Sequence, residues 1–199
     1  MSKGAATRQR IVAKAATLFN QHGFEGSSLT ALMKATGLEK GGIYRHFSSK
    51  EAMAVEAFDY AWKAAVEIRT RELDKFPNSV DWLKQFIANF AERPSPVPGG
   101  CPLLNTAIDS DDGNPVLRQR VREALDGWRK RLVTRIKSGI AAKEIRRNID
   151  ARKLATLIIS SLEGALMICR LERDREALHS VKSYLHGYLE GEVRSQSLK

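Results

Sequence analysis

The side chains with the clearest binding chemistry in this sequence lie between residues 27 and 50. Hydroxyl and cationic groups recur there, and such groups donate hydrogen bonds to phosphate oxygens. Gly41 and Gly42 stand side by side, although each glycine weakens a helix by about 1 kcal/mol relative to alanine. That cost is understandable where a backbone must approach a partner closely, as in a DNA major groove, which admits a helix. Duplex DNA is therefore the partner we expect.

Two short helices must position these groups. The apolar spacing predicts one helix over residues 28–36 and a second over residues 40–47, in which Ile43 and Phe47 are buried. Gly37 separates the two helices. One face of the second helix packs and the other is free to touch a partner, which is the arrangement of a helix-turn-helix.

Several further residues follow a specific order. A helix start rich in hydroxyl groups comprises Ser27, Ser28 and Thr30. It is followed, in order, by Gly37-Leu38, Lys40-Gly41, Tyr44, His46-Phe47 and Ser49-Lys50-Glu51. This order resembles the DNA-binding domain of TetR-type bacterial transcriptional regulators over about residues 7–55. The resemblance implies a DNA-binding regulator whose second helical domain encloses a small-molecule site.

The predicted DNA-contacting set combines this resemblance with residue chemistry. It comprises Ser28, Thr30, Lys40, Gly41, Gly42, Tyr44, Arg45, His46 and Lys50. By resemblance, Lys40 and the two glycines face base edges, whereas Tyr44, His46 and Lys50 contact phosphate. Arg45 either pairs with a guanine or reaches only phosphate. The hydroxyls of Ser28 and Thr30 cap their helix, bind phosphate, or do both.

Charge and composition agree with an acidic partner. The net charge is +10, and residues 1–50 hold eight lysines and arginines against two glutamates, so +6 falls in that segment. We therefore place the positive excess around the helix-turn-helix. Cys101 and Cys169 lack CxxC spacing and suit reduced thiols in a cytoplasm better than a structural disulfide. No signal peptide and no run of about 18 apolar residues is apparent, so we expect a cytoplasmic protein without a membrane partner.

The remaining sequence predicts helices throughout. Their expected ranges are 7–22, 49–73, 79–93, 101–109, 115–143, 151–171 and 175–191. The predicted fold is all-α with about nine helices. A three-helix DNA-binding domain, residues 1–50, precedes a larger helical ligand-binding and dimerisation domain, residues 51–199.

Helix 151–171 is apolar around most of its circumference, so it must be buried on more than one side. Small residues on it favour close approach of another helix, and we expect it to form a four-helix homodimer interface with the last helix. The expected interface residues are Leu154, Ile158, Ser161, Ala165, Ile168, Tyr184 and Tyr188. The alternative is a helix central to the monomer core. A two-fold dimer places the second helix of each helix-turn-helix, which we call the reading helix, about 34 Å from its counterpart. Such a dimer requires a palindromic operator.

Aromatic residues with an occasional amide suit an apolar or aromatic ligand. The candidate ligand-binding residues are Phe58, Trp62, Trp82, Phe86, Phe90, Cys101, Leu104, Asn105, Ile108, Trp128 and Met167. Plain core packing is the alternative for each. A ligand that shifts the helix beginning near residue 49 would change the spacing of the two reading helices. The resemblance implies repression relieved by a small-molecule inducer.

Cys101 offers a different mode of regulation. It would lie at the N-terminus of a helix, where a thiol becomes more reactive, so sensing of electrophiles or oxidants is an alternative to ligand binding. A buried, unreactive thiol is the simpler interpretation. A non-specific DNA-binding protein is a further alternative, and it would bind every sequence alike.

No enzymatic motif is present. The sequence lacks GxSxG, HExxH, P-loop and GxGxxG arrangements, and its four histidines are scattered. We expect no catalytic residues, no cofactor and no metal site.

Overall fold

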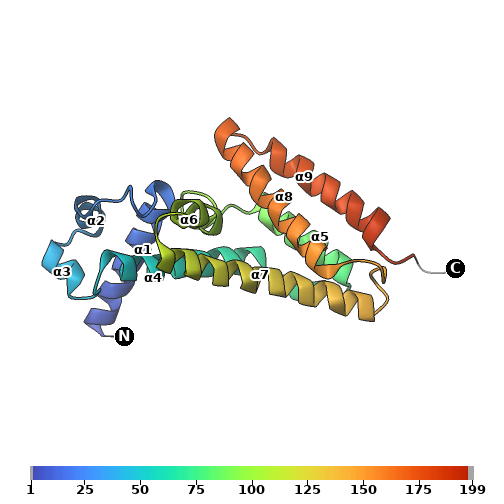
Figure 1. Ribbon diagram of the computed structural model, residues 1–199, viewed down its shortest axis with the longest axis horizontal. Helices are drawn as coiled ribbons and strands as arrows, with labels where there is room; N and C mark the ends of the chain where they lie inside the picture. The colour runs from blue at the N-terminus through green and yellow to red at the C-terminus, as the bar shows by residue number, and fades with distance from the viewer. Residues whose placement is uncertain (1, 197–199) are drawn as a thin grey trace. The chain divides into compact units, whose positions relative to one another are not determined.

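The computed structural model describes residues 2–196, which form nine α-helices (Figure 1). These are α1 (Lys3–His22), α2 (Leu29–Thr36), α3 (Lys40–Tyr44), α4 (Lys50–Arg69), α5 (Ser79–Glu92), α6 (Pro102–Ser110), α7 (Pro115–Ala141), α8 (Ala151–Glu172) and α9 (Glu176–Tyr188). A 3₁₀ turn covers Leu73–Lys75 and a π-helical turn covers Leu189–Val193. Within this part of the chain the only β-type pairing is one bridge between Ile145 and Arg194. The predicted all-α architecture is confirmed.

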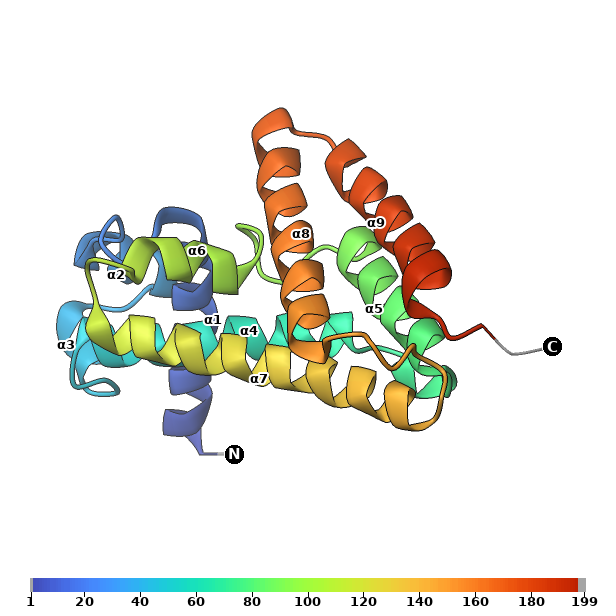
Figure 2. The same ribbon diagram turned by 45° about the vertical axis from the view of Figure 1, so that its right-hand side comes forward.

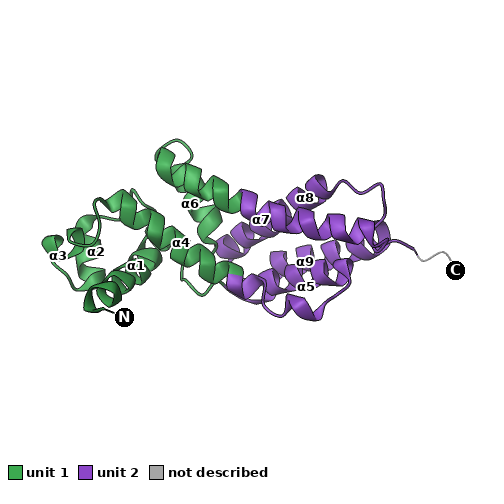
Figure 3. Ribbon diagram, turned by 90° about the horizontal axis from the view of Figure 1, so that it is seen from below, with its two compact units in different colours: residues 1–66, 95–125 green, residues 67–94, 126–199 purple. Residues whose placement is uncertain are grey.

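The chain divides into two compact units, drawn in different colours in Figure 3. Unit 1 comprises residues 1–66 and 95–125, and unit 2 comprises residues 67–94 and 126–199. From the sequence we expected one domain boundary, after residue 50. The structure instead groups α6 and the start of α7 with the N-terminal helices.

The core of unit 1 is built from one face of each N-terminal helix. Its buried apolar side chains are Ile11, Val12, Ala15, Ala16, Leu32, Ile43, Phe47, Met53, Ala57, Ala61 and Val97. Helix α1 begins earlier than the predicted Thr7, because the Ser2 hydroxyl accepts a hydrogen bond from the Ala5 N–H at 3.2 Å and caps it. Gly37 ends α2 with φ of 69°, a left-handed conformation that glycine adopts without strain.

The second helix of the helix-turn-helix is shorter than predicted. It ends at Tyr44, and Phe47 reaches the core from the segment that follows. The capping residue of α4 is Ser49, whose hydroxyl accepts the Ala52 N–H at 3.0 Å. The sequence pattern Ser48 to Glu51 had instead favoured Ser48 as the cap.

Unit 2 packs α5, α8 and α9 together, with α8 and α9 side by side (Figure 2). Asp150 caps α8 as expected, accepting the Arg152 and Lys153 N–H groups at 2.9 and 3.0 Å. Among the described residues, α8 is the one helix long and apolar enough to cross a membrane by length and composition, and 44% of that window is buried. The sequence did not lead us to expect such a helix, because polar and small residues interrupt its apolar run.

The C-terminal turn is fastened to α5 by charged side chains. Arg194 pairs with Asp81 and, at 2.6 Å from its Nε, with Glu190, whose carboxylate also accepts from Lys84 Nζ at 2.6 Å. The hydrogen bonds from Arg194 and then Lys84 lower the pKa of Glu190 from 4.5 to about 2.

This lowered pKa makes unit 2 sensitive to acid. The contribution of Glu190 to stability is fully present above pH 4.5 and is lost as the pH falls towards about 2, where the folded chain also protonates it. Glu190→Gln should therefore lower the free energy of unfolding at neutral pH and approach wild type in strong acid. Urea unfolding at a series of pH values measures this difference. Glu192→Gln removes the same charge from a longer 3.5 Å contact with Arg146 and is the control, which should show a smaller difference. A Glu190→Gln difference that does not vary with pH would contradict the assignment.

Candidate nucleic-acid interface

The start of α2 presents two hydroxyl groups on the surface of unit 1. Ser28 is the N-cap, and its oxygen accepts the Ala31 N–H at 3.1 Å. Its own hydroxyl hydrogen remains able to donate, because capping uses only the oxygen as acceptor. Thr30 is exposed beside it. The predicted double role of capping and phosphate binding is therefore sterically possible for Ser28.

Helix α3 has one buried and one exposed face. Ile43 is completely buried, whereas Lys40, Gly41 and Arg45 are exposed and Tyr44 is 36% exposed. No described atom lies within 4 Å of the position that a Cβ on Gly41 would take. Packing within the chain therefore does not require glycine there, and a contact of Gly41 with DNA stays a prediction.

Two of the residues predicted to contact phosphate, His46 and Lys50, already make hydrogen bonds within unit 1. His46 is half-buried and its carbonyl oxygen accepts a hydrogen bond from Arg8. Lys50 Nζ donates to the Phe24 carbonyl oxygen at 2.5 Å and lies 4.3 Å from the centre of the Phe24 ring. The Lys50 ammonium is thus held within unit 1, and contact with phosphate remains a prediction.

Arg8 is a functional candidate that the sequence analysis missed. Its guanidinium pairs with Glu56 on α4, lies 4.4 Å from the Phe47 ring centre and donates to the His46 carbonyl. One side chain thereby joins α1, α4 and the segment that follows α3. A signal was present: Arg8 lies three residues before the buried Ile11, so the cation sits on the apolar side of α1.

The charge distribution requires a correction. Residues 115–153 carry thirteen lysines and arginines against four aspartates and glutamates, a net +9. The positive excess is therefore not confined to the helix-turn-helix. The net charge of residues 51–199 is only +4, because acidic residues elsewhere offset this basic stretch. Part of the second basic stretch is neutralised by ion pairs, as in Arg120 with Asp59 and Arg129 with Asp126.

The candidate ligand-binding residues fall into both units. In unit 1, Phe58 faces a small cavity of about 20 Å³. The ring of Trp62 stacks on the ring of Phe58, with the ring centres 6.5 Å apart. Cys101 is only 1% exposed, and Leu104 is half-buried on α6. Asn105 is occupied by hydrogen bonds to α1 and the preceding loop. Ile108 is exposed on α6 and does not face an enclosed space there.

The unit 2 members form an aromatic cluster. Trp82 stacks on Phe86, and Phe90 stacks on Trp128 with ring centres 6.0 Å apart. Arg69 is buried against this cluster, with its guanidinium 4.3 Å from the centre of the Phe90 ring. Met167 is exposed on α8.

The predicted dimer residues are divided by burial. Leu154, Ile158 and Ala165 are buried within unit 2 and pack against their own chain, so they expose little surface to a second copy. Ile168 and Tyr184 are exposed, and Ser161 and Tyr188 are half-buried. A helix that is apolar on two sides had left both possibilities open. The exposed side of α8 is instead marked by Leu157, Met167, Ile168 and Leu171.

Family models match both parts of the chain. The model described as bacterial regulatory proteins of the tetR family covers residues 11–57. The model described as the tetracyclin repressor-like C-terminal domain covers residues 80–185.

Individual relatives match over most of the length. The HTH-type transcriptional repressor DhaR of Mycobacterium sp. (strain GP1) is 27% identical over 172 residues, which cover 86% of each chain. The crystal structure of a TetR transcriptional regulator from Chloroflexus aurantiacus J-10-FL is 48% identical, with a TM-score of 0.93, and covers 98% of this chain and 100% of that one. A TetR-family regulator from Cytophaga hutchinsonii is 38% identical, with a TM-score of 0.91 and 99% coverage of both chains.

The contacts of Arg8 predict a positioning role in DNA binding. Arg8→Ala removes the donor to the His46 carbonyl, and Glu56→Gln removes the charge that orients Arg8. Both should weaken duplex DNA binding by about three- to tenfold, which corresponds to the net free energy of one ordinary hydrogen bond. Fluorescence anisotropy with a labelled duplex measures this.

Glu56→Gln separates positioning from simple electrostatics. It makes the chain more positive, so a purely electrostatic effect would strengthen DNA binding. Tighter binding by Glu56→Gln would therefore contradict the positioning role of Arg8.

Proposed function

The chain belongs to the TetR family of bacterial transcriptional regulators, and on this basis we propose that it is a repressor that binds a palindromic operator as a homodimer. We further propose that a small molecule in the C-terminal domain releases it from DNA. The observation that carries the proposal is the exposed side of α3, where Gly41, Tyr44 and Arg45 stand out from a helix whose Ile43 is fully buried. The relatives are transcriptional regulators, and DhaR is a repressor. Neither catalysis nor a cofactor is part of the proposal.

Dimerisation is supported by an apolar stripe on the outside of unit 2. Leu157, Met167 and Leu171 recur at helical spacing on α8 and are exposed, and Leu171 is 77% exposed. Tyr184 on α9 is 70% exposed, and α8 and α9 lie side by side (Figure 2). Large apolar side chains gathered on one surface mark an interface in most proteins. A second copy of the chain is the partner we propose, because a two-fold pair supplies the second reading helix that a palindrome needs.

The same stripe explains why α8 is apolar enough to resemble a membrane-spanning helix in composition. One side of the helix is buried in unit 2 and the other carries the proposed dimer face, so both sides are apolar. A cytoplasmic location without a membrane partner is accordingly part of the proposal, since the protein acts on DNA.

The aromatic cluster of unit 2 supports an inducer in the C-terminal domain. Trp82, Phe86 and Trp128 provide the flat apolar surfaces that bind aromatic or apolar molecules. Regulation through Cys101 is less well supported, because a 1% exposed thiol is shielded from electrophiles.

Selection from a random pool of duplex DNA tests the operator. At near-physiological salt, the wild-type chain should enrich a palindrome, whereas Arg45→Ala should bind it about tenfold or more weakly, as expected for loss of a good base contact. Lys34→Ala is the matched control, because Lys34 is an exposed cation on α2 outside the predicted contacts. Enrichment of no sequence, or equal loss in both variants, would leave only non-specific binding and would refute the proposed function.

A charge within the apolar stripe tests the dimer. Leu171→Glu should convert the homodimer to a folded monomer, because a carboxylate in an apolar interface loses its hydration without gaining a partner. Light scattering after size exclusion measures the mass, and circular dichroism measures helicity. Val116→Glu is the control, since Val116 is an exposed apolar residue of unit 1. A dimeric Leu171→Glu protein would place the interface elsewhere.

A further inference from the structure

Helix α6 is bound to the end of α1 by a network of side-chain amides. Asn20, near the end of α1, is 6% exposed, and its Nδ2 donates to the carbonyl oxygens of Pro98 at 2.9 Å and Gly100 at 3.2 Å. From α6, Asn105 Nδ2 donates to Asn20 Oδ1 at 3.0 Å, to the Asn20 carbonyl at 2.9 Å and to the Gly99 carbonyl at 2.8 Å. Because the neighbouring carbonyls can only accept, the orientation of both amides is fixed by the network.

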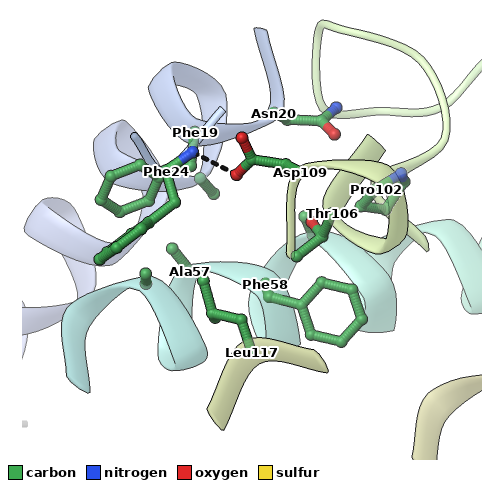
Figure 4. Close-up of a pocket in the computed structure, with 12 residues that line it drawn as sticks. Phe19, Asn20, Phe24, Ala57, Phe58, Pro102, Thr106, Asp109 and Leu117 are labelled. Atoms are coloured by element: carbon green, nitrogen blue, oxygen red, sulfur yellow. Dashed lines mark hydrogen bonds between the residues drawn. The ribbon is translucent and has the colours of Figure 1, made fainter. Parts of the chain in front are cut away.

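A second contact joins α6 to the turn between α1 and α2. Asp109 Oδ2 accepts the Phe24 N–H at 2.6 Å, as the dashed line in Figure 4 marks. The approach is close enough to exclude a side chain: a Cβ on Gly23, whose φ is +75°, would lie 2.5 Å from Asp109 Oδ1. The contact therefore needs glycine both for the backbone conformation and for space.

The backbone of Phe24 is held from two directions. Its N–H is bound by Asp109 of α6, and its carbonyl accepts from Lys50, the first residue of α4. Directly after the turn, Ser27 is 1% exposed and donates to the Gly23 carbonyl at 2.6 Å, immediately before the Ser28 cap of α2. A short path of hydrogen bonds thus runs from α6 to the start of the helix-turn-helix and to a predicted phosphate-binding lysine.

The packing beside these contacts is incomplete. A cavity of about 20 Å³ lies between α1, α4 and α6, with Phe58, Thr106 and Asp109 among its lining residues (Figure 4). That volume is about enough for one water molecule. Small residues of α4, such as Ala57, face it, so α4 and α6 are not fully packed against each other at this point.

We propose that Asn105 and Asp109 are positioning residues of the DNA-reading unit. Together with Asn20, Phe24 and Lys50 they form what we call the α6 latch, which makes operator affinity depend on the placement of α6. The proposal rests on the proposed operator binding and adds a route of regulation to it. Any molecule that moves α6 changes the α1–α2 turn directly, in addition to any movement of α4. By linkage, operator binding must in turn restrain α6.

Variants on α6 test the latch through DNA binding. Asn105→Leu removes the amide donors and Asp109→Ala removes the acceptor, whereas Asp109→Asn keeps an oxygen that can accept from Phe24. The first two should weaken binding to the selected palindrome about tenfold, within the usual range of coupling between sites. Binding to a random duplex should change much less, because phosphate contacts tolerate small errors of position and base contacts do not. Asp109→Asn should recover most of the loss.

Ile108→Ala is the matched control, because Ile108 lies on the same helix, is exposed and takes no part in the latch. It should bind the palindrome like the wild type. Circular dichroism and thermal melting of each variant establish that it is folded at the assay temperature.

Hydrogen exchange provides a readout that a merely structural role would not change. Addition of the selected palindrome should slow amide exchange in residues 102–110 of the wild type, and this protection should disappear in Asp109→Ala with the DNA still saturating. Unchanged operator affinity in Asn105→Leu and Asp109→Ala overturns the latch. Equal weakening on palindrome and random duplex, or no protection of α6 in the wild type, also overturns it.

The two proposals fail in different ways. If the wild-type chain enriches no sequence, the operator proposal fails and the latch fails with it. If a palindrome is enriched and the α6 variants behave like Ile108→Ala, only the latch fails.

Discussion

The placement of α2 and α3 depends on the backbone of Phe24. Its N–H and its carbonyl are bound by side chains from two different helices, Asp109 on α6 and Lys50 on α4. The turn at this point connects α1 to α2, so whatever orients it also orients the helix-turn-helix. A backbone peptide in a half-buried turn must have its hydrogen bonds satisfied, and here both partners are long-range side chains. Side chains outside the helix-turn-helix therefore help to set the orientation of α2.

A similar division of labour is seen at the other end of α3. Arg8 supplies a cation to the His46 carbonyl and to the Phe47 ring, while Glu56 neutralises it. The exposed side of α3 is left to its glycines and to Tyr44 and Arg45. Residues that position the helix and residues that face outward are thus largely different residues.

The second domain shows how one composition serves two purposes. Helix α8 buries Leu154 and Ile158 against its own unit and presents Leu157 and Leu171 outward. Both sets are aliphatic, and only a three-dimensional packing arrangement separates them. The aromatic cluster around Arg69 is likewise ambiguous in sequence, because aromatic residues at helical spacing build cores and ligand sites equally well.

The sequence by itself determined the helix-turn-helix, the all-α fold and most helix ends, because these follow from short-range rules. Ser28 and Asp150 cap helices as expected, and Gly37 ends α2, since each acts on backbone groups within a few residues. Tertiary structure alone decided the roles of Asn105 and Asp109 and the side of α8 that is exposed. The Asp109–Phe24 bond joins residues 85 positions apart, and no local pattern encodes such a pairing. Lys50 illustrates the difference within one residue: its place at the start of α4 was readable from sequence, whereas its bond to Phe24 required the packed domain.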